Sequence, residues 1–279
     1  MRSGLAGAAC VLVLVVSSPA PAQPRLLIKG AAAHVTVIPE PRRDIQVTQV
    51  RRNPDLALQI RRDGDSVVVD GGLGKRVHGC ARNGRGSPGV RVRGLGVIAD
   101  GALPLLVVRA PMDVRLATAD GVNGEVGRAH SLDLQNRGCG DWTIANVRGR
   151  LGLVQVGPGV VRTGAAGVAD LSVAEGGEIK TGPVSGSLIG VSSGESAITA
   201  TSVEGTIVAR VAGSGRVVIR AGRSRSFNAS VAGSGRIEFD GLAGSVTASV
   251  TGPGVVSVAH ASGPVVRKVF GSGVVRVGR

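Results

Sequence analysis

Four similar stretches near the C-terminal end of the sequence decide the fold: Val211-Ala-Gly-Ser-Gly-Arg-Val-Val-Ile219, Val231-Ala-Gly-Ser-Gly-Arg-Ile-Glu-Phe239, Val250-Thr-Gly-Pro-Gly-Val-Val-Ser-Val258 and Val269-Phe-Gly-Ser-Gly-Val-Val-Arg-Val277. The first glycines of these stretches follow one another at steps of 20, 19 and 19 residues. The same step leads back to Gly157-Pro-Gly159 and Gly138-Cys-Gly140, and looser copies lie at Glu175-Gly-Gly177 and Ser193-Gly194. A fixed period of this size indicates a repeat architecture.

Each repeat has the pattern of two short strands and two turns. After the Gly-x-Gly turn, apolar side chains alternate with variable ones, as Val217 and Ile219 do around Val218, and this alternation is typical of a half-buried strand. A unit of about 19 residues cannot bury its apolar row alone, so the units must stack. We therefore predict an all-β fold, a parallel β-solenoid with about 19 residues per coil. The glycines expected to form its turns are Gly138, Gly140, Gly157, Gly159, Gly213, Gly215, Gly233, Gly235, Gly252, Gly254, Gly271 and Gly273.

The composition agrees with a narrow interior. The hydrophobic share of 43% is too high for a disordered chain, and the 45 glycines follow no collagen period. One Trp, three Phe and no Tyr are too few for a thick two-layer core. Trp142 falls on an inward position, and we expect it to fill the core.

The N-terminal third lacks the repeat. Residues 1–22 have the organisation of a secretory signal peptide, with Arg2, an apolar run and the cleavage motif Ala20-Pro21-Ala22. The apolar run is shorter than the roughly 20 residues that span a bilayer, and no transmembrane span is expected. We expect residues 23–112 to form an irregular β region that caps a solenoid over residues 113–279. The strand-like runs of this region are 34–38, 44–50, 56–60, 66–70 and 105–110, and a loop from Gly71 to Gly96 interrupts them.

Export would remove Cys10 and leave Cys80 and Cys139. Two cysteines in an oxidising compartment predict one disulfide, Cys80–Cys139, with two buried thiols as the alternative. The four histidines are scattered along the sequence, so neither a metal site nor a cofactor is expected.

The recurring Val-x-Gly-Ser-Gly-x-Val/Ile stretch resembles the head GIN domain of the auto-transporter adhesins, a family of exported bacterial β-helical proteins. The resemblance is strongest over residues 205–277, and Asp113-Val-Arg-Leu and Gly140-Asp-Trp-Thr-Ile extend it toward residue 113. The sequence departs from the family pattern in the coils between residues 175 and 195 and in three turns, Gly-Pro-Gly at 157 and 252 and Gly-Cys-Gly at 138. The resemblance implies an envelope or cell-surface location and an adhesive or structural role, and it supplies no catalytic residue.

No pattern predicts catalysis. Gly190-Val-Ser192-Ser-Gly194 fits the nucleophile elbow of hydrolases, but no helical pattern follows it as that motif requires. From Gly149 onward, Glu238 and Asp240 are the only acidic residues that share a face within one strand. We expect Asp240 to form a surface ion pair with Arg220. A carbohydrate-active β-helix enzyme is the minor alternative.

The formal net charge of +14 has two interpretations. A base composition that favours Arg, Ala and Gly explains it without function, and attraction to an anionic envelope polymer or surface glycan explains it with function. Nucleic-acid binding is not expected, because aromatic stacking residues are absent. The densest basic stretch of the solenoid is Arg210, Arg216, Arg220, Arg223, Arg225 and Arg236, and another runs from Lys75 to Arg93.

We therefore expect a non-enzymatic, adhesin-like β-solenoid that binds an envelope or surface ligand. The alternative is a periplasmic structural or regulatory-accessory protein that docks a protein partner. The expected location is the periplasm, the outer-membrane surface or the extracellular space. Because no cap is evident after Gly278, the C-terminal edge could also pair with another copy of the chain.

Overall fold

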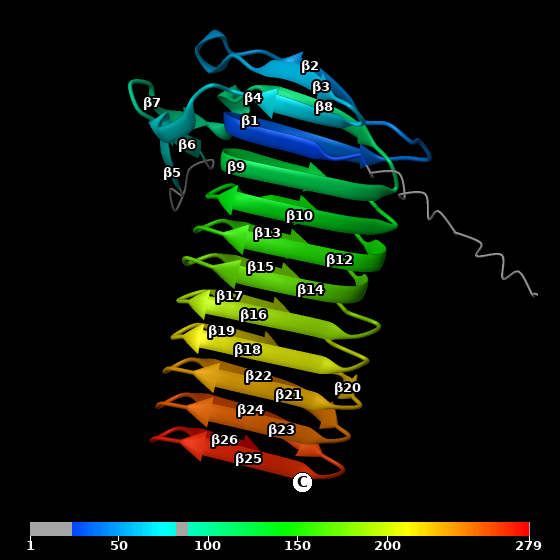
Figure 1. Ribbon diagram of the computed structural model, residues 1–279, viewed down its shortest axis with the longest axis vertical. Helices are drawn as coiled ribbons and strands as arrows, with labels where there is room; N and C mark the ends of the chain where they lie inside the picture. Colours follow the sequence, from blue (N-terminus) through cyan, green and yellow to red (C-terminus); the bar gives the residue numbers. More distant parts are fainter. Residues whose placement is uncertain (1–23, 82–88, 279) are drawn as a thin grey trace, which may run out of the picture.

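The computed structural model describes residues 24–81 and 89–278. The predicted signal peptide and part of the Gly71–Gly96 loop lie outside these residues. The chain is an all-β parallel β-solenoid of about nine turns with roughly 19 residues per turn, as predicted. Figure 1 shows the coils stacked as a ladder along the long axis of the molecule.

Two main ladders of parallel strands run along the stack. One consists of β9 (Asp113–Val126), β10 (Ser131–Gly138), β12 (Val147–Val156), β14 (Ala166–Ala174), β16 (Leu188–Gly194), β18 (Ile207–Gly213), β21 (Phe227–Ala232), β23 (Val246–Thr251) and β25 (Val265–Phe270). We call its outer surface the long face. The other consists of β11 (Trp142–Ile144), β13 (Val160–Thr163), β15 (Glu178–Thr181), β17 (Ala197–Ala200), β19 (Arg216–Ile219), β22 (Arg236–Ala243), β24 (Val255–Ala261) and β26 (Val274–Val277).

A narrower third ladder closes each coil. It is built from single bridges such as Val184 to Val203 and from β20 (Arg223–Ser224), which pairs with β22. The one 20-residue step of the repeat falls here, since Ile207 is in register with Phe227.

The alternating residues point where the pattern predicts. Val217, Ile219 and Phe239 are fully buried, and the rings of Phe227 and Phe239 stack with centroids 5.4 Å apart. Trp142 is also fully buried, so its predicted place in the core is confirmed. Its six-membered ring explains Gly124, because a Cβ there would lie 2.7 Å from that ring.

The two glycines of a Gly-x-Gly turn serve different purposes. The first has a positive φ, which is +118° at Gly233 and +102° at Gly252, a region that side chains with a Cβ avoid. The second makes room for the core, because a Cβ on Gly254 would lie 2.4 Å from Cγ1 of Val231. Gly138 does not share the positive φ, but a Cβ there would meet the carbonyl oxygen of Asp120 at 2.0 Å.

A buried polar column replaces valine in the first coils of the long ladder. Thr118 Oγ1 donates to Asn136 Oδ1 at 2.8 Å, and Asn136 Nδ2 donates to Gln155 Oε1 at 2.7 Å. The same amides also donate to turn carbonyls: Asn136 to Gly140, and Gln155 to Gly138 and Gly157. Each buried polar side chain of the column is thus hydrogen-bonded, as burial demands.

The parallel stack continues beyond Asp113 into the N-terminal region, out of chain order. The strand β1 (Leu26–Pro39) lies in parallel on β9, and β4 (Ser66–Asp70) and β8 (Leu105–Ala110) lie in parallel side by side on β1 (Figure 1). Two antiparallel strands follow, β2 (Gln46–Arg51) on β8 and β3 (Gln59–Asp63) on β4. The antiparallel strands end the parallel ladder at this side of the molecule.

Two details of the N-terminal prediction are wrong. The run 56–60 is not one strand, because a 3₁₀ turn (η1, Pro54–Leu56) precedes β3. The proposed loop from Gly71 to Gly96 contains a 3₁₀ turn (η2, Gly74–Arg76) and the strands β5 (Val77–Ala81) and β6 (Gly89–Val92), and β7 (Gly96–Ala99) begins at its end. These three strands form an antiparallel sheet, and a further 3₁₀ turn, η3, spans Asp100–Ala102. The sheet packs on its own apolar cluster, which includes Leu56, Leu73, Val90, Val92 and Leu103.

A disulfide joins this small sheet to the solenoid. Cys80 of β5 is bonded to Cys139, which lies in the turn between β10 and β11, with Cα atoms 5.5 Å apart. The predicted pairing is therefore present. It closes a sequence separation of 59 residues.

Candidate functional site

The residues that suggested hydrolase chemistry are not arranged for it. Ser192 is fully buried, and its hydroxyl donates to the carbonyl oxygen of Ser196 at 2.8 Å. It is therefore a structural side chain of the coil. The expected ion pair between Asp240 and Arg220 is absent from the described residues, and the neighbouring Glu238 instead accepts from Arg236 at 2.8 Å.

The basic residues of the densest stretch do not form one patch. Arg210 lies on the long face, Arg216 and Arg236 lie in register on the other main ladder, and Arg223 begins β20 at the third side. These cations are exposed on different sides of the rod. These arginines therefore offer no single basic surface to an anionic polymer, and such a partner stays a prediction.

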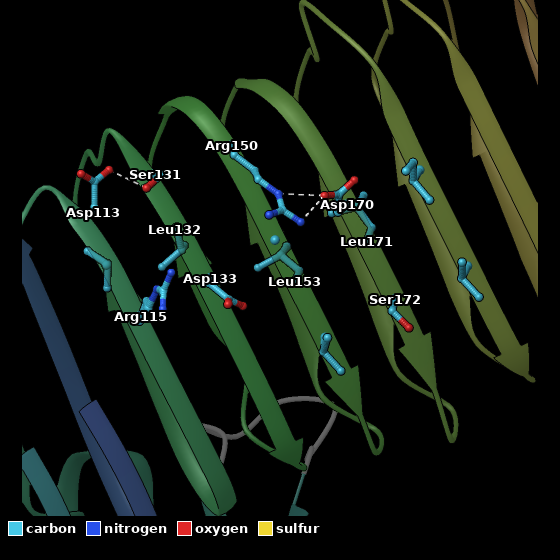
Figure 2. Close-up of a pocket in the computed structure, with 15 residues that line it drawn as sticks. Asp113, Arg115, Ser131, Leu132, Asp133, Arg150, Leu153, Asp170, Leu171 and Ser172 are labelled. Carbon is cyan, nitrogen blue, oxygen red and sulfur yellow. Dashed lines mark hydrogen bonds and ion pairs between the residues drawn. The ribbon is translucent and has the colours of Figure 1, made fainter. Parts of the chain in front are cut away.

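A groove on the long face gathers polar and apolar side chains. It has a volume of about 410 Å³ and crosses the strands β9, β10, β12, β14 and β16. Figure 2 shows the lining side chains spread over these neighbouring coils. The coils present these residues side by side because the parallel register places equivalent outward positions in columns.

One part of the groove is charged. Asp113 accepts from Ser131 Oγ at 2.5 Å and lies 2.9 Å from His130 Nδ1. The hydrogen bond from Ser131 and the contact with His130 hold the pKa of the Asp113 carboxyl below its usual value. Two coils further on, Arg150 Nε donates to Asp170 Oδ2 at 2.8 Å (Figure 2).

The other part of the groove is apolar. Its floor consists of Val154, Ile189 and Val191, all on outward positions of the sheet. Ile189 is 42% exposed. The hollow exists because Gly152 has no side chain between its register partners Asp133 and Asp170.

The apolar floor belongs to a larger apolar surface. Val168 is 39% exposed at one side of the floor, and Val208 is in register with Ile189 on the next coil. Ser172 lies in register between Val154 and Val191, so the apolar side chains surround one hydroxyl. Exposed apolar side chains gathered on an outer sheet face are a feature of binding surfaces. In the part of the chain that the structure describes, no cluster of three or more metal-ligating side chains occurs, and no helix is long and apolar enough to cross a membrane.

Sequence reasoning missed this groove. We expected the outward positions of each strand to be wet and variable, which holds for Ser230, Ser249 and Lys268. The signal that could have revealed the groove is the presence of valine and isoleucine at outward positions of two coils that lie two steps apart, Val154 in β12 and Ile189 and Val191 in β16.

The fold and the groove define a β-solenoid with an amphipathic surface hollow. No family model matches the chain, and no curated protein matches it. Among solved structures, the chain is similar to a "putative lipid binding protein" from Parabacteroides distasonis, with a TM-score of 0.54, 14% sequence identity and 92% of each chain covered. At this identity the likeness concerns the fold alone.

Proposed function

We propose that this chain is an exported, non-enzymatic envelope protein that binds an amphiphile, a molecule with an acyl chain and a polar head group, in the groove of the long face. The observation that carries the proposal is the apolar floor of the groove, made of exposed Ile189 and half-buried Val154 and Val191, beside a row of charged side chains. An acyl chain on this floor would remove apolar surface from water, which stabilises the complex by about 25 cal/mol per Å² of buried area. The charged row would remain available to the head group.

The side chains of the groove favour an acyl chain over a sugar ring. Its apolar lining is aliphatic throughout, whereas sugar binding usually employs an aromatic face. Trp142, Phe227 and Phe239 are buried in the core and cannot serve as such a face. The printed name of the solved neighbour agrees with a lipid ligand.

The other functional predictions stand beside this proposal. Membership of the GIN-domain family, an adhesive role, surface display and docking of a protein partner stay predictions. The disulfide between Cys80 and Cys139 supports export, since such bonds persist in oxidising compartments.

A direct binding measurement tests the proposal. The purified protein is titrated with a fluorescent single-chain amphiphile below its micelle concentration, and the Kd is measured by anisotropy. Ile189→Glu places a charge on the apolar floor and is expected to weaken binding at least about tenfold, or about 1.4 kcal/mol. The matched control is Val218→Glu, which places the same charge on an outward position of β19, on a different side of the rod.

The proposal requires binding that responds to the first variant and not to the second. Circular dichroism must show that both variants retain the fold. If no amphiphile binds, or if both variants bind as well as the unaltered protein, the groove is not an amphiphile site.

A further inference from the structure

Two opposite charges of the groove lie on neighbouring strands without a direct ion pair between them. Arg115 of β9 and Asp133 of β10 are in register on adjacent strands. Both are exposed, and both line the groove. No ion pair joins them within 4 Å among the described contacts, and Figure 2 draws none between them.

The other charges of the groove already have partners. Asp113 is held by Ser131 and His130, and Asp170 is held by Arg150. The free charges are therefore one guanidinium, at Arg115, and one carboxylate, at Asp133. A ligand that completes this site must supply an anion and a cation a few bonds apart.

We propose that the groove selects an amphiphile with a zwitterionic head group, its anionic group on Arg115 and its cationic group on Asp133. This inference rests on the proposed function, because the acyl chain must lie on the apolar floor. A phosphate with a nearby ammonium has this chemistry. Planar Arg binds phosphate oxygens through two N–H groups.

The hollow at Gly152 supplies room for the cation. Gly152 lies between Asp133 and Asp170 in the register, and a Cβ at Gly152 would lie 3.7 Å from Oδ1 of Asp133. A bulky ammonium in this hollow lies beside the carboxylate of Asp133, and Asp170, which is paired with Arg150, borders the hollow on the other side. The carboxylate of Asp133 repels a head group that carries only negative charge.

A set of amphiphiles with one chain length separates the possibilities. The probes are an alkyl phosphocholine, an alkyl phosphoglycerol, an alkyl trimethylammonium and an uncharged alkyl glycoside, with free phosphocholine as the head group without a chain. We expect the alkyl phosphocholine to bind about tenfold more tightly than the other three amphiphiles, because only its head group combines a phosphate for Arg115 with an ammonium charge for Asp133. Free phosphocholine is expected to bind far more weakly than the alkyl form.

Variants assign the preference to the two residues. Arg115→Gln and Asp133→Asn should each remove most of the preference for the phosphocholine over the alkyl glycoside. The double exchange Arg115→Asp with Asp133→Arg keeps both charges and should retain part of the preference. Val218→Glu serves again as the control on another side of the rod.

The outcomes distinguish this inference from the proposed function. If all four amphiphiles bind equally and Ile189→Glu still weakens them, the groove binds amphiphiles without selecting a zwitterion, and only the inference is overturned. If free phosphocholine binds as tightly as the alkyl form, the ligand is a soluble zwitterion, and the role of the apolar floor fails. If none of the amphiphiles binds, both proposals fail.

Discussion

The buried polar column offers a stability test whose magnitude follows from the contacts. Asn136 is fully buried and makes three hydrogen bonds: it accepts from Thr118 at 2.8 Å and donates to Gln155 at 2.7 Å and to the carbonyl of Gly140 at 3.0 Å. Asn136→Val removes all three hydrogen bonds. Thr118, Gln155 and the carbonyl of Gly140 then lose this partner inside the core. At about 1 kcal/mol for each net hydrogen bond, the free energy of unfolding should fall by about 3 kcal/mol.

Valine itself fits this position. The register continues the column from Gln155 to Val173 in the next coil, and Val211 occupies it two coils later, after Ser192. The loss therefore comes from unmade hydrogen bonds and not from a misfit in shape. The triple variant with valine at 118, 136 and 155 should be less destabilised than the sum of its single changes, because the partners disappear together.

Urea denaturation followed by circular dichroism measures both effects. With a slope of about 3 kcal/mol per M, the midpoint of Asn136→Val should shift by about 1 M. A shift below about 0.2 M would show that the column contributes little to stability. Strict additivity of the three valine substitutions, within about 0.5 kcal/mol, would refute the idea that the column acts as one network.

Three further experiments test other features. Val217→Asp buries an unpaired charge and should lower the free energy of unfolding, measured in a urea titration, by at least about 3 kcal/mol. Glu238→Gln removes only an exposed ion pair and should lower it by less than about 1 kcal/mol. Equal effects of the two substitutions would show that the inward register is wrong. Reduction of the Cys80–Cys139 disulfide, which spans 59 residues, should lower the free energy of unfolding by up to about 4 kcal/mol in the chain-entropy model. Hydrogen exchange should rise first in β5 to β7, and unchanged exchange there would contradict this expectation. The pKa of Asp113 is lower in the folded protein, so its carboxylate stabilises the fold at pH values above its unfolded pKa of about 3.9. This stabilisation disappears as the pH falls through the folded pKa. The unaltered protein should therefore lose more stability than Asp113→Asn between about pH 5 and pH 2, and parallel curves would contradict the assignment.

The solenoid itself could be predicted because each coil repeats the same local rules. The positive-φ glycine, the core-facing valine and the alternation of strand residues recur at a fixed step, as at Gly233, Val231 and Ile237. Because each strand pairs with its equivalent in the next coil, the repeat also fixes the register. The disulfide could be predicted because removal of the expected signal peptide would leave only Cys80 and Cys139.

The N-terminal order could not be predicted from the same rules. Leu26 of β1 is in register with Leu116 of β9, which lies 90 residues away in the sequence. No local pattern records such a partner, since periodicity identifies a strand and not its neighbour. The small sheet β5 to β7 was missed because glycine and arginine dominate its sequence, although Val90 and Val92 are buried on its inner side.

The groove could not be predicted from the alternation of inward and outward residues. A period of two separates inward from outward residues, but it does not show which outward residues of several coils lie together in a hollow. Gly152 illustrates this: it resembles a turn glycine in the sequence, yet it lies within β12 and leaves a space on the long face.

The place of β1 in the stack sets an order of events during synthesis. Residues emerge from the ribosome from the N-terminus onward, but β1 has its parallel partners in β4, β8 and β9. About ninety residues must follow it before β9 exists, and closing so long a loop is slow. The repeated coils, in contrast, find each partner within about 20 residues. Assembly should therefore start within the repeats, and the N-terminal segment, the first to be made, should be among the last to reach its final neighbours. Until then its apolar residues are open to aggregation, so mutations that speed coil stacking alone should not improve the yield of folded protein.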